Sequence, residues 1–501
     1  MAPQIDGGCG YHIFPTFVSE LEPKEIWKHF DSILNIPRGS GEEDAIREYV
    51  LWVAKNTATR MRDLTIDDVG NVIIRKSATL GYEDRTMVTL QSHKDMVNTI
   101  ADEESLPKGF EPFPIRPIME DGWLVSKYRT LGADNGVGVC IMLAIMESES
   151  VVHGPLEFLF TVDEETGLTG ARKLQSGFLK GKYLLNLDSE EEGVITIGCA
   201  GGARAELRLP IERAVLPSSP YYKIFTLKIS DCKGGHSGLD IHLGRANAIK
   251  VLAQILREFH YDQLRLIHFE GGSRLNVIPQ SASATIAVPR MELQEFIDVF
   301  MIVKGQYKKV DPDMKLTIQE THDMDVLDVL TESSYTKTLS LLGVIPHGVL
   351  AMSKDVKDLV ETSNNLATVR MNEGEMKIEV MYRSLKESAL VATQDKINSL
   401  ASIWKADVTT EKGYGCWQPD PNSYLLSVAK ETYKNMFAKD PEIMAIHAGF
   451  ESGVIKATYP SMETISIGPS MQNVHIPGER VHIASVAKFY SYLCELLKNI
   501  Q

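Results

Sequence analysis

The first two hundred residues alternate between short apolar runs and segments in which apolar positions have helical spacing. Residues 88–90, 156–162 and 183–187 are typical of short buried strands, and residues 137–146 predict a helix between the first two. Residues 43–55 show the same helical spacing. This alternation predicts an α/β layer built on a mixed, largely parallel sheet between helices.

The pattern changes after about residue 204. Apolar and polar residues alternate at 225–229 and 376–382, as in half-buried strands of an antiparallel sheet. Helical spacing at 249–256 and 293–301 predicts helices that cover one face of that sheet. We therefore expect a two-layer α+β domain in this part of the chain.

Helical and short apolar segments return after a turn-rich joint at residues 416–422 and continue to residue 501. The sequence therefore predicts a discontinuous catalytic domain of residues 1–203 and 412–501. Residues 204–411 would form an inserted domain.

Composition and charge narrow the class of protein. The chain has 44% hydrophobic and 24% charged residues, as ordinary globular proteins do. Its net charge of −15 opposes binding to nucleic acid or to an anionic membrane surface. No stretch is apolar enough to span a bilayer, no secretory signal opens the sequence, and the six cysteines lack metal-ligand spacing. We expect a cytoplasmic protein.

Potential ligand residues follow the predicted strands, where open α/β sheets place their sites. His93 and Asp95 follow the first strand, Asp134 precedes the helix at 137–146, residues 163–165 follow the second strand, and Asp188 follows the third. Each has an ordinary alternative. A lone histidine is usually a hydrogen-bonded residue, Asp134 is a helix N-cap candidate, and acidic runs are usually solvated or lie in first helical turns.

Taken together, these residues point to a metal site. Carboxylates that converge at one end of a sheet repel one another unless a cation lies among them. Carboxylate and imidazole ligands suit Zn²⁺ and similar ions, and paired metals are typical of aminopeptidase-type hydrolases. Asp95 lies two residues after His93, on the same side of an extended segment, and could fix the histidine tautomer.

Several short runs of sequence occur in a recognisable order between residues 90 and 481. They are LQSHKDMV (90–97), TLGADNG (130–136), DEETGLTG (163–170), LNLDSEE (185–191), GCAGG (198–202), KGGHSG (233–238), SRLNVIP (273–279), HAGFESG (447–453) and HIPGERV (475–481). In this order they resemble the M20 family of metallopeptidases. Within it they are most similar to the aminoacyl-histidine dipeptidases, also called cytosol non-specific dipeptidases.

The resemblance implies a zinc-peptidase-like catalytic domain with two divalent metal ions, either Zn²⁺ or the alternatives Mn²⁺ and Co²⁺. His93 and Asp188 would hold one ion, and Glu165 and His475 the other. Asp134 would bridge the pair.

The resemblance also implies two roles beside the metals. Glu164 would be the general base, and Asp95 would orient His93. Because Glu164 and Glu165 are adjacent, one can bind metal while the other faces the water, but spacing alone does not say which.

The choice of His475 over His482 depends on flanking residues at 468–469 and 479–481 that match the family's last ligand segment. Two positions and one segment depart from the family pattern. Ile476 replaces a usual serine, Ser452 stands where cysteine is common, and residues 98–104 differ. The first departure concerns a contact beside the ligand His475, and the other two concern specificity more than the type of reaction.

The inserted domain would act as a lid. Its His236 would stabilise the oxyanion, although a glycine-rich turn with a solvated histidine is an equal alternative from the sequence. Asn276 and Arg383 are candidates for holding the carboxylate of a substrate, and His447 and Glu451 for its amino end. For His447 and Glu451, a self-stabilised polar turn is the alternative.

The predicted function is hydrolysis of dipeptides of the Xaa-His type, with broad specificity, by a metal-bridging hydroxide and the base Glu164. One alternative is an M20-type deacylase of N-acyl amino acids, and another is a catalytically silent metal-binding scaffold. The resemblance further implies a homodimer formed through the lid domain. Small dipeptides are the expected partners.

Overall fold

The computed structural model describes residues 5–6, 12–13, 15–57, 61–217, 222–258, 264–289, 293–321 and 326–501. The chain divides into two compact units. Unit 1 comprises Met1–Gly198, Pro419–Ala445 and Phe450–Gln501, and unit 2 comprises Cys199–Gln418 and Ile446–Gly449. The expected boundaries at 203/204 and 411/412 fall inside two paired strands of unit 2, β11 (Gly201–Pro210) and β21 (Asp407–Tyr414).

Unit 1 is built on an eight-stranded sheet with the order β22-β10-β23-β9-β5-β8-β4-β3. The four central strands β23, β9, β5 and β8 are parallel, and β10, β4 and β3 pair antiparallel beside them. The strands are β3 (Met61–Ile66), β4 (Val72–Lys76), β5 (Val88–His93), β8 (Leu156–Thr161), β9 (Tyr183–Asn186), β10 (Val194–Cys199), β22 (Glu442–Ile446) and β23 (Glu463–Ser466). This confirms the predicted mixed, largely parallel sheet.

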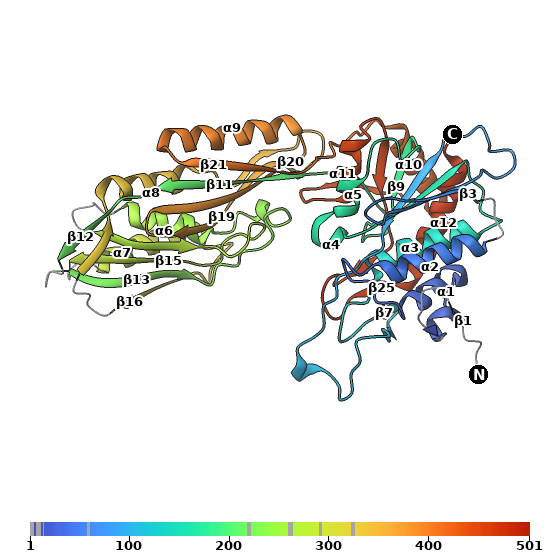
Figure 1. Ribbon diagram of the computed structural model, residues 1–501, viewed down its shortest axis with the longest axis horizontal. Helices are drawn as coiled ribbons and strands as arrows, with labels where there is room; N and C mark the ends of the chain where they lie inside the picture. The colour runs from blue at the N-terminus through green and yellow to red at the C-terminus, as the bar shows by residue number, and fades with distance from the viewer. Residues whose placement is uncertain are drawn as a thin grey trace. The chain divides into compact units, whose positions relative to one another are not determined.

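Helices pack against this sheet. Helix α3 packs on β5, α10 and α11 contact β23, and Figure 1 shows α1, α2 and α3 close together in unit 1. The helices of unit 1 are α1 (Lys24–Ile33), α2 (Asp44–Asn56), α3 (Ala133–Glu147), α4 (Glu164–Gly167), α5 (Thr169–Lys173), α10 (Tyr424–Phe437), α11 (Glu451–Thr458) and α12 (Ile483–Asn499), with short 3-10 turns at Phe17–Glu20 and Glu103–Ser105.

Smaller strands complete unit 1. A four-stranded sheet has the order β24-β25-β7-β6, and β1 pairs with β2. Their bounds are β1 (Ile5–Asp6), β2 (His12–Ile13), β6 (Ile118–Glu120), β7 (Trp123–Val125), β24 (Met471–Gln472) and β25 (Arg480–His482). The sheet that contains β25 brings residues after 470 beside residues 118–125.

Unit 2 contains a nine-stranded sheet with the order β16-β13-β15-β14-β19-β20-β11-β21, and β18 also pairs with β19. The pairs are antiparallel, as the alternating pattern predicts. Besides β11 and β21, its strands are β13 (Tyr222–Ser230), β14 (Arg265–Gly271), β15 (Ala282–Pro289), β16 (Lys315–Glu320), β18 (Gly348–Met352), β19 (Val360–Met371) and β20 (Glu375–Ser384). A separate pair joins β12 (Arg213–Pro217) to β17 (Val326–Leu330).

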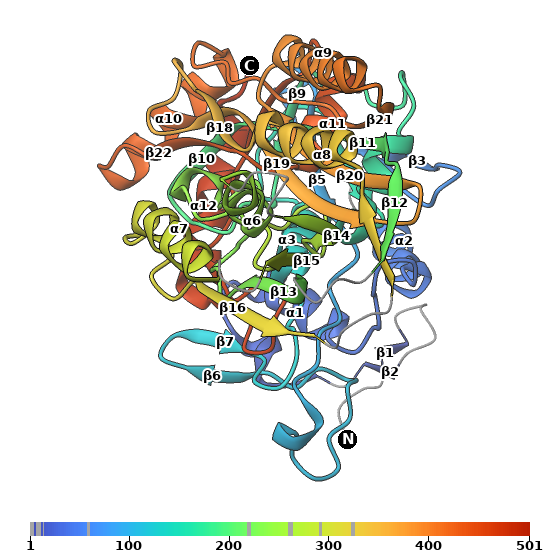
Figure 2. The same ribbon diagram turned by 90° about the vertical axis from the view of Figure 1, so that its left-hand side faces the viewer.

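The helices of unit 2 form one layer. Figure 2 shows α9, α8, α6 and α7 following one another along one side of the strands of this unit, and α6 and α9 both contact the sheet. Their bounds are α6 (Ala248–Arg257), α7 (Leu293–Gln306), α8 (Glu332–Val344) and α9 (Glu387–Trp404), with a 3-10 turn at Ile241–Leu243. The predicted two-layer α+β architecture is confirmed, because these helices bury the apolar positions of the alternating strands.

Two further findings concern the whole described chain. None of its helices is both long and apolar enough to cross a bilayer. Cys140, Cys199, Cys232, Cys416 and Cys494 form no disulfide, and Cys9 lies outside the described residues.

Candidate metal centre

Three parallel strands bring the predicted ligands to one edge of the sheet in unit 1. His93 is the last residue of β5, Glu164 and Glu165 follow β8 at the start of α4, and Asp188 follows β9. Parallel strands place their carboxyl ends at the same edge, so these side chains converge although they are far apart in sequence.

Asp134 lies between two histidines. Its Oδ1 is 3.1 Å from Nε2 of His93, and its Oδ2 is 3.1 Å from Nε2 of His475. Nε2 of His93 is also 3.3 Å from Oδ1 of Asp188, and Nε2 of His475 is 2.9 Å from Oε2 of Glu165. One carboxylate therefore faces two separate histidine and carboxylate pairs, one with each oxygen.

The ligand atoms form compact groups. Atoms of His93, Asp134 and Asp188 lie within 4.8 Å of one another, as do atoms of Asp134, Glu165 and His475. These two groups share Asp134. A third group at the same spacing joins His93 to Glu164 and Glu165. The structure thus brings all five predicted ligands and the predicted base together, and the geometry alone leaves Glu164 able to bind a metal.

The charges and pKa shifts of the ligand cluster suit the binding of cations. Hydrogen bonds to Asp134 and Glu165 raise the pKa of His475 to about 11. Burial, with the negative charge of Asp134, raises the pKa of Asp188 to about 6. Glu165 Oε1 is buried and has no hydrogen-bond partner among the described residues. An excess of negative charge with an unsatisfied carboxylate oxygen is the environment that divalent ions neutralise, so the residues present fit a metal site.

Asp95 contacts both sides of the cluster. Its Oδ1 is 3.3 Å from Nδ1 of His93, and its two oxygens accept the backbone N–H groups of Glu164 and Glu165 at 3.1 and 3.2 Å. Ser40 Oγ donates to it at 2.8 Å. Asp95 is fully buried, and these hydrogen bonds hold its pKa well below the usual range although burial opposes this. It can therefore fix the His93 ring and the turn that carries both glutamates.

Glu164 lies beside this cluster in a strongly negative environment. Burial raises the pKa of its carboxyl well above the usual value, and the nearby charges of Asp188 and Glu451 act in the same direction. A carboxyl with a raised pKa beside a hydrolytic site is suited to proton transfer.

His236 belongs to unit 2. Its Nδ1 accepts the backbone N–H groups of Gly238 and Leu239 at 3.3 and 3.1 Å. Burial, with the charge of Arg383, lowers the pKa of His236 to about 4. At neutral pH the ring is therefore neutral, and because Nδ1 is an acceptor, the proton lies on Nε2 and can be donated.

The other substrate-contact candidates of unit 2 lie near His236. The charges of Arg383 and His236 both act on His447, whose pKa burial lowers to about 3. Asn276 is exposed, and its backbone carbonyl accepts the N–H of Ser237 at 2.8 Å. Arg383 is buried, contacts the Tyr414 hydroxyl, and forms no ion pair with a carboxylate among the described residues. This group can accommodate a negative charge.

Glu451 lies in unit 1, at the start of α11, and its side chain is fully buried. Its Oε2 accepts hydrogen bonds from Gln91 Nε2 at 2.6 Å and Thr161 Oγ1 at 2.7 Å. Its Oε1 has no partner among the described residues. Contact between Glu451 and a substrate's amino end stays a prediction, and access to the carboxyl group would be required for it.

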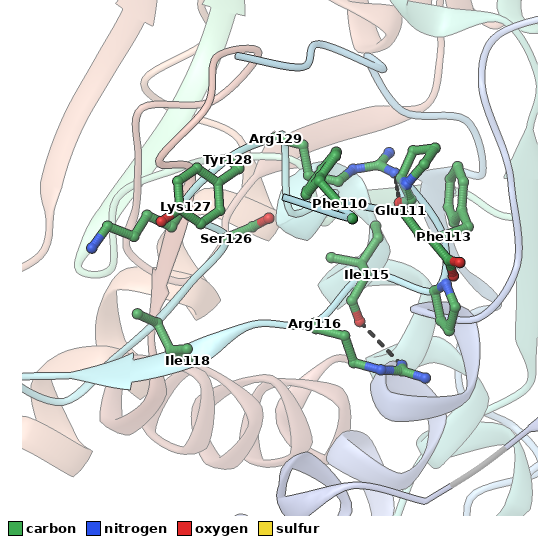
Figure 3. Close-up of a pocket in the computed structure, with 13 residues that line it drawn as sticks. Phe110, Glu111, Phe113, Ile115, Arg116, Ile118, Ser126, Lys127, Tyr128 and Arg129 are labelled. Atoms are coloured by element: carbon green, nitrogen blue, oxygen red, sulfur yellow. Dashed lines mark hydrogen bonds between the residues drawn. The ribbon is translucent and has the colours of Figure 1, made fainter. Parts of the chain in front are cut away.

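A pocket of about 570 Å³ lies elsewhere in unit 1 and contains none of the predicted site residues. Figure 3 shows it between Phe110, Phe113, Ile115 and Tyr128, with Ser126 on its wall. Its lining combines aromatic and aliphatic residues with the charged residues Glu111, Arg116, Lys127 and Arg129, and it contains no cluster of carboxylates or histidines among the described residues. The candidate metal centre is therefore identified from the positions of its ligand residues, and this pocket is not part of it.

Three residues at the centre were not assigned a role from the sequence. Asn135 Nδ2 donates to Asp188, Arg38 donates to backbone carbonyls around the cluster, and Glu479 accepts backbone N–H groups beside Asp134. Asn135 and Glu479 are in the same motifs as Asp134 and His475, so proximity in sequence was an available signal. Arg38 has no such signal.

Comparisons with known proteins identify the family of the chain. Residues 89–499 match the family described as peptidase family M20/M25/M40. The chain is 38% identical to the cytosol non-specific dipeptidase of Escherichia coli (strain K12), over 96% of this chain and 99% of that protein.

Two solved structures are similar to this chain. The crystal structure of aminoacylhistidine dipeptidase from Vibrio alginolyticus has a TM-score of 0.87 at 35% identity, covering 97% of this chain and 98% of that one. Aminopeptidase PepT from Bacillus cereus, at 16% identity and a TM-score of 0.56 over 96% of this chain and 99% of that one, shares the fold. This chain belongs to peptidase family M20/M25/M40.

Proposed function

We propose that this chain is a metal-dependent dipeptidase. The observation that carries the proposal is the position of Asp134, whose two carboxylate oxygens each face a different histidine. A shared carboxylate of this kind suits a pair of divalent ions. Similarity along nearly the whole chain to a protein named cytosol non-specific dipeptidase supports the same reaction.

His93, Asp134 and Asp188 would hold one ion, and Asp134, Glu165 and His475 the other. When bound, divalent ions polarise the scissile carbonyl and lower the pKa of the attacking water. We infer Zn²⁺ as the resident metal, with Mn²⁺ or Co²⁺ as alternatives, because carboxylate and imidazole ligands suit all three.

Glu164 would take the proton from the attacking water and return it to the leaving amine. Its raised pKa favours this exchange, because the carboxyl group can hold the proton between the two steps. Asp95 would keep Glu164 in place through the backbone N–H group that it accepts. We assign Glu165 to the metal and Glu164 to the proton on the family resemblance.

His236 would donate its Nε2 proton to the oxyanion of the tetrahedral intermediate. The two N–H groups that Nδ1 accepts support this role, because they select the tautomer that can donate. Arg383 and Asn276 would hold the carboxylate of the dipeptide, and His447 and Glu451 its amino end. For Arg383, the absence of a carboxylate partner among the described residues supports the role.

We further propose broad specificity that includes Xaa-His dipeptides, a cytoplasmic location and a homodimer formed through unit 2. The names of two similar proteins mention the cytosol and aminoacylhistidine. Sedimentation equilibrium of the purified chain tests the dimer, and a sedimentation mass of one chain would contradict it.

A dipeptide panel with metal analysis tests the proposed activity. We expect hydrolysis of Xaa-His dipeptides that stops with a chelator and returns with Zn²⁺, Mn²⁺ or Co²⁺. The matched control is the same dipeptide with an acetylated amino terminus, which a dipeptidase should not cleave. Preferential cleavage of the acetylated compound would favour the deacylase alternative, and metal binding without any hydrolysis would favour the scaffold.

A further inference from the structure

A single buried carboxylate holds the backbone that carries Asp134. Oε2 of Glu479 accepts the N–H groups of Leu131 and Gly132 at 2.7 and 2.9 Å. Oε1 accepts those of Ala133 and Asp134 at 2.7 and 3.3 Å. Glu479 is only 2% exposed, so these four N–H groups replace the water that would otherwise solvate it.

The N–H groups of Leu131 and Gly132 lie just before α3, and those of Ala133 and Asp134 are its first two. The first N–H groups of a helix have no partner within the helix, and Gly132, the residue before α3, offers no side chain to cap them. A carboxylate suits this place because both of its oxygens are acceptors, and the non-helical backbone of Asp134 and Asn135 makes the contacts those of a loop that leads into the helix. Here the cap comes from residue 479, although Asp134 lies 345 positions earlier in the sequence.

Glu479 belongs to the segment that carries His475. Its backbone is anchored by Ser126, which is labelled in Figure 3: the Ser126 N–H donates to the Glu479 carbonyl at 3.0 Å. The N–H of Gly478 donates to the Ser126 carbonyl at 2.8 Å. Glu479 thus joins the His475 segment directly to the Asp134 segment.

Arg38 holds the same loop from its carbonyl side. Its guanidinium donates to the carbonyls of Lys94 and Asp95 at 3.1 and 2.9 Å, and to that of Gly132. Gly132 has a φ of 71°, and a Cβ there would lie 2.4 Å from Nη2 of Arg38. The loop therefore has little freedom to move relative to either histidine segment.

We propose that Glu479 is a positioning residue that sets the separation of Asp134 and His475 and thereby the affinity of the ion shared by Asp134, Glu165 and His475. The inference rests on the proposed function, because it assigns Glu479 to one of the two proposed metal positions. Residues that orient metal ligands typically change metal affinity by about 10–100-fold when they are replaced.

The test is Glu479→Gln. The amide keeps one acceptor oxygen, but its NH₂ group faces two N–H donors, so half of the contacts to the loop become repulsive. We expect one of two ions to bind roughly 10–100-fold more weakly when Zn²⁺ or Mn²⁺ is titrated into metal-free protein. The absorption spectrum of the Co²⁺ form should change, and raised metal concentration should restore hydrolysis.

Glu157→Gln is the matched control. Glu157 is equally buried and accepts the N–H groups of Lys180 and Gly181, but it lies near the start of β8, at the opposite end from Glu164 and Glu165. Its replacement should alter the denaturation midpoint without changing metal affinity. A merely structural role for Glu479 predicts the same behaviour for both variants.

The outcomes separate the two proposals. Metal affinities of Glu479→Gln equal to those of wild type would overturn the inference while leaving the dipeptidase proposal intact. Wild-type protein that binds no divalent ion would overturn the proposed function itself. If Glu479→Gln does not fold, Glu479→Asp retains both acceptor oxygens on a shorter side chain. In this variant, one of the two ions should bind more weakly and the absorption spectrum of the Co²⁺ form should shift. Wild-type metal affinities and a wild-type spectrum would again overturn the inference.

Discussion

The sheets of the two units bury polar side chains on different strands and to different extents. In unit 1, one face of β5, β8 and β9 carries Thr89, Gln91, Glu157, Thr161 and Asn186, all with no exposed surface. In unit 2, the polar positions of β11 and of β20 up to Glu379 are at least partly exposed while their apolar neighbours enter the core. The buried polar residues of this sheet lie on β19, at positions 362–365 and 368, and at the end of β20, at Arg383 and Ser384. The first sheet therefore buries polar groups on its central parallel strands, whereas β11 and most of β20 in the second leave theirs exposed to water.

Hydrogen bonding makes the burial in unit 1 possible. Gln91 donates to Glu451 at 2.6 Å and accepts from Asn186 at 2.5 Å, which in turn accepts from Ser466. Buried polar groups without partners would cost about 1–3 kcal/mol each. In unit 1 the buried polar groups lie on the strands that lead to the candidate metal centre, whereas in unit 2 β11 and the first part of β20 follow simple amphipathic patterning.

The largest expected effect is on catalysis in unit 1. Glu164→Gln should lower kcat by about 10²–10⁴-fold with metal content unchanged, because the amide cannot accept the proton of the attacking water. Steady-state kinetics and elemental analysis measure both quantities. Glu165→Gln is the contrasting variant and should lose metal. Full activity in Glu164→Gln would contradict the assigned base.

The next effect concerns the apolar core of unit 2. Leu252 on α6 is fully buried, and Leu252→Ala should lower the free energy of unfolding by about 2–5 kcal/mol through lost burial and a cavity. Hydrogen exchange should increase within unit 2. Val391→Ala, at a position 51% exposed on α9, is the control and should have little effect. Equal increases in exchange throughout unit 1 would show that the two units do not unfold separately.

A smaller, pH-dependent effect is expected at Glu451. Burial raises the pKa of its carboxyl to about 8. A carboxyl group whose pKa is raised on folding stabilises the protein at low pH, and this contribution is lost as pH rises towards 8. Glu451→Gln should therefore gain stability relative to wild type between about pH 4 and pH 8, with a slope of at most about 1.4 kcal/mol per pH unit.

Denaturant titrations across this pH range measure the slope, and a difference between variant and wild type that does not depend on pH would contradict the expectation. The same variant bears on substrate binding. If Glu451→Gln raises the KM for dipeptides while its stability has the same pH dependence as that of wild type, contact of Glu451 with the substrate's amino end would be supported instead.

The smallest expected effect on stability is that of removing an exposed ion pair between β11 and β21 in unit 2. Arg204 and Glu411 form a two-point ion pair at 2.8 and 2.5 Å, but both side chains are about half exposed. Exposed pairs of this kind contribute little because water and salt screen them. Arg204→Ala should leave the denaturation midpoint unchanged within error. A clear decrease that disappears in high salt would show that this ion pair contributes more than its exposure indicates.

Periodicity and local motifs were enough to predict much of the fold and most of the candidate centre. The apolar run at 137–146 became the buried helix α3, and the alternation at 376–382 became β20. His93, Asp134 and Asp188 were found because strand ends and helix starts are local features. Periodicity also predicted a buried strand at 88–90, but it did not indicate that Gln91, the next residue of β5, would be buried as well.

The long-range contacts of the centre could not be predicted in the same way. Glu479 lies in the HIPGERV motif and Arg38 in none of the motifs, and neither could be given a role, because nothing in a linear pattern says which backbone groups a buried charge will meet. Contact of Glu451 with the amino end of a substrate stays a prediction, and its hydrogen bonds to Gln91 and Thr161 were not indicated by the sequence.

The amino-acid sequence by itself determined the two kinds of sheet, their helices and the chemical character of the ligands, since these follow from spacing over a few residues. Only the tertiary structure decided that His475 lies beside Asp134, 341 positions away, and that Glu479 caps the backbone leading to it. The physical reason is that such contacts depend on how the parallel strands and the final segment pack together, and local preferences do not encode those distances.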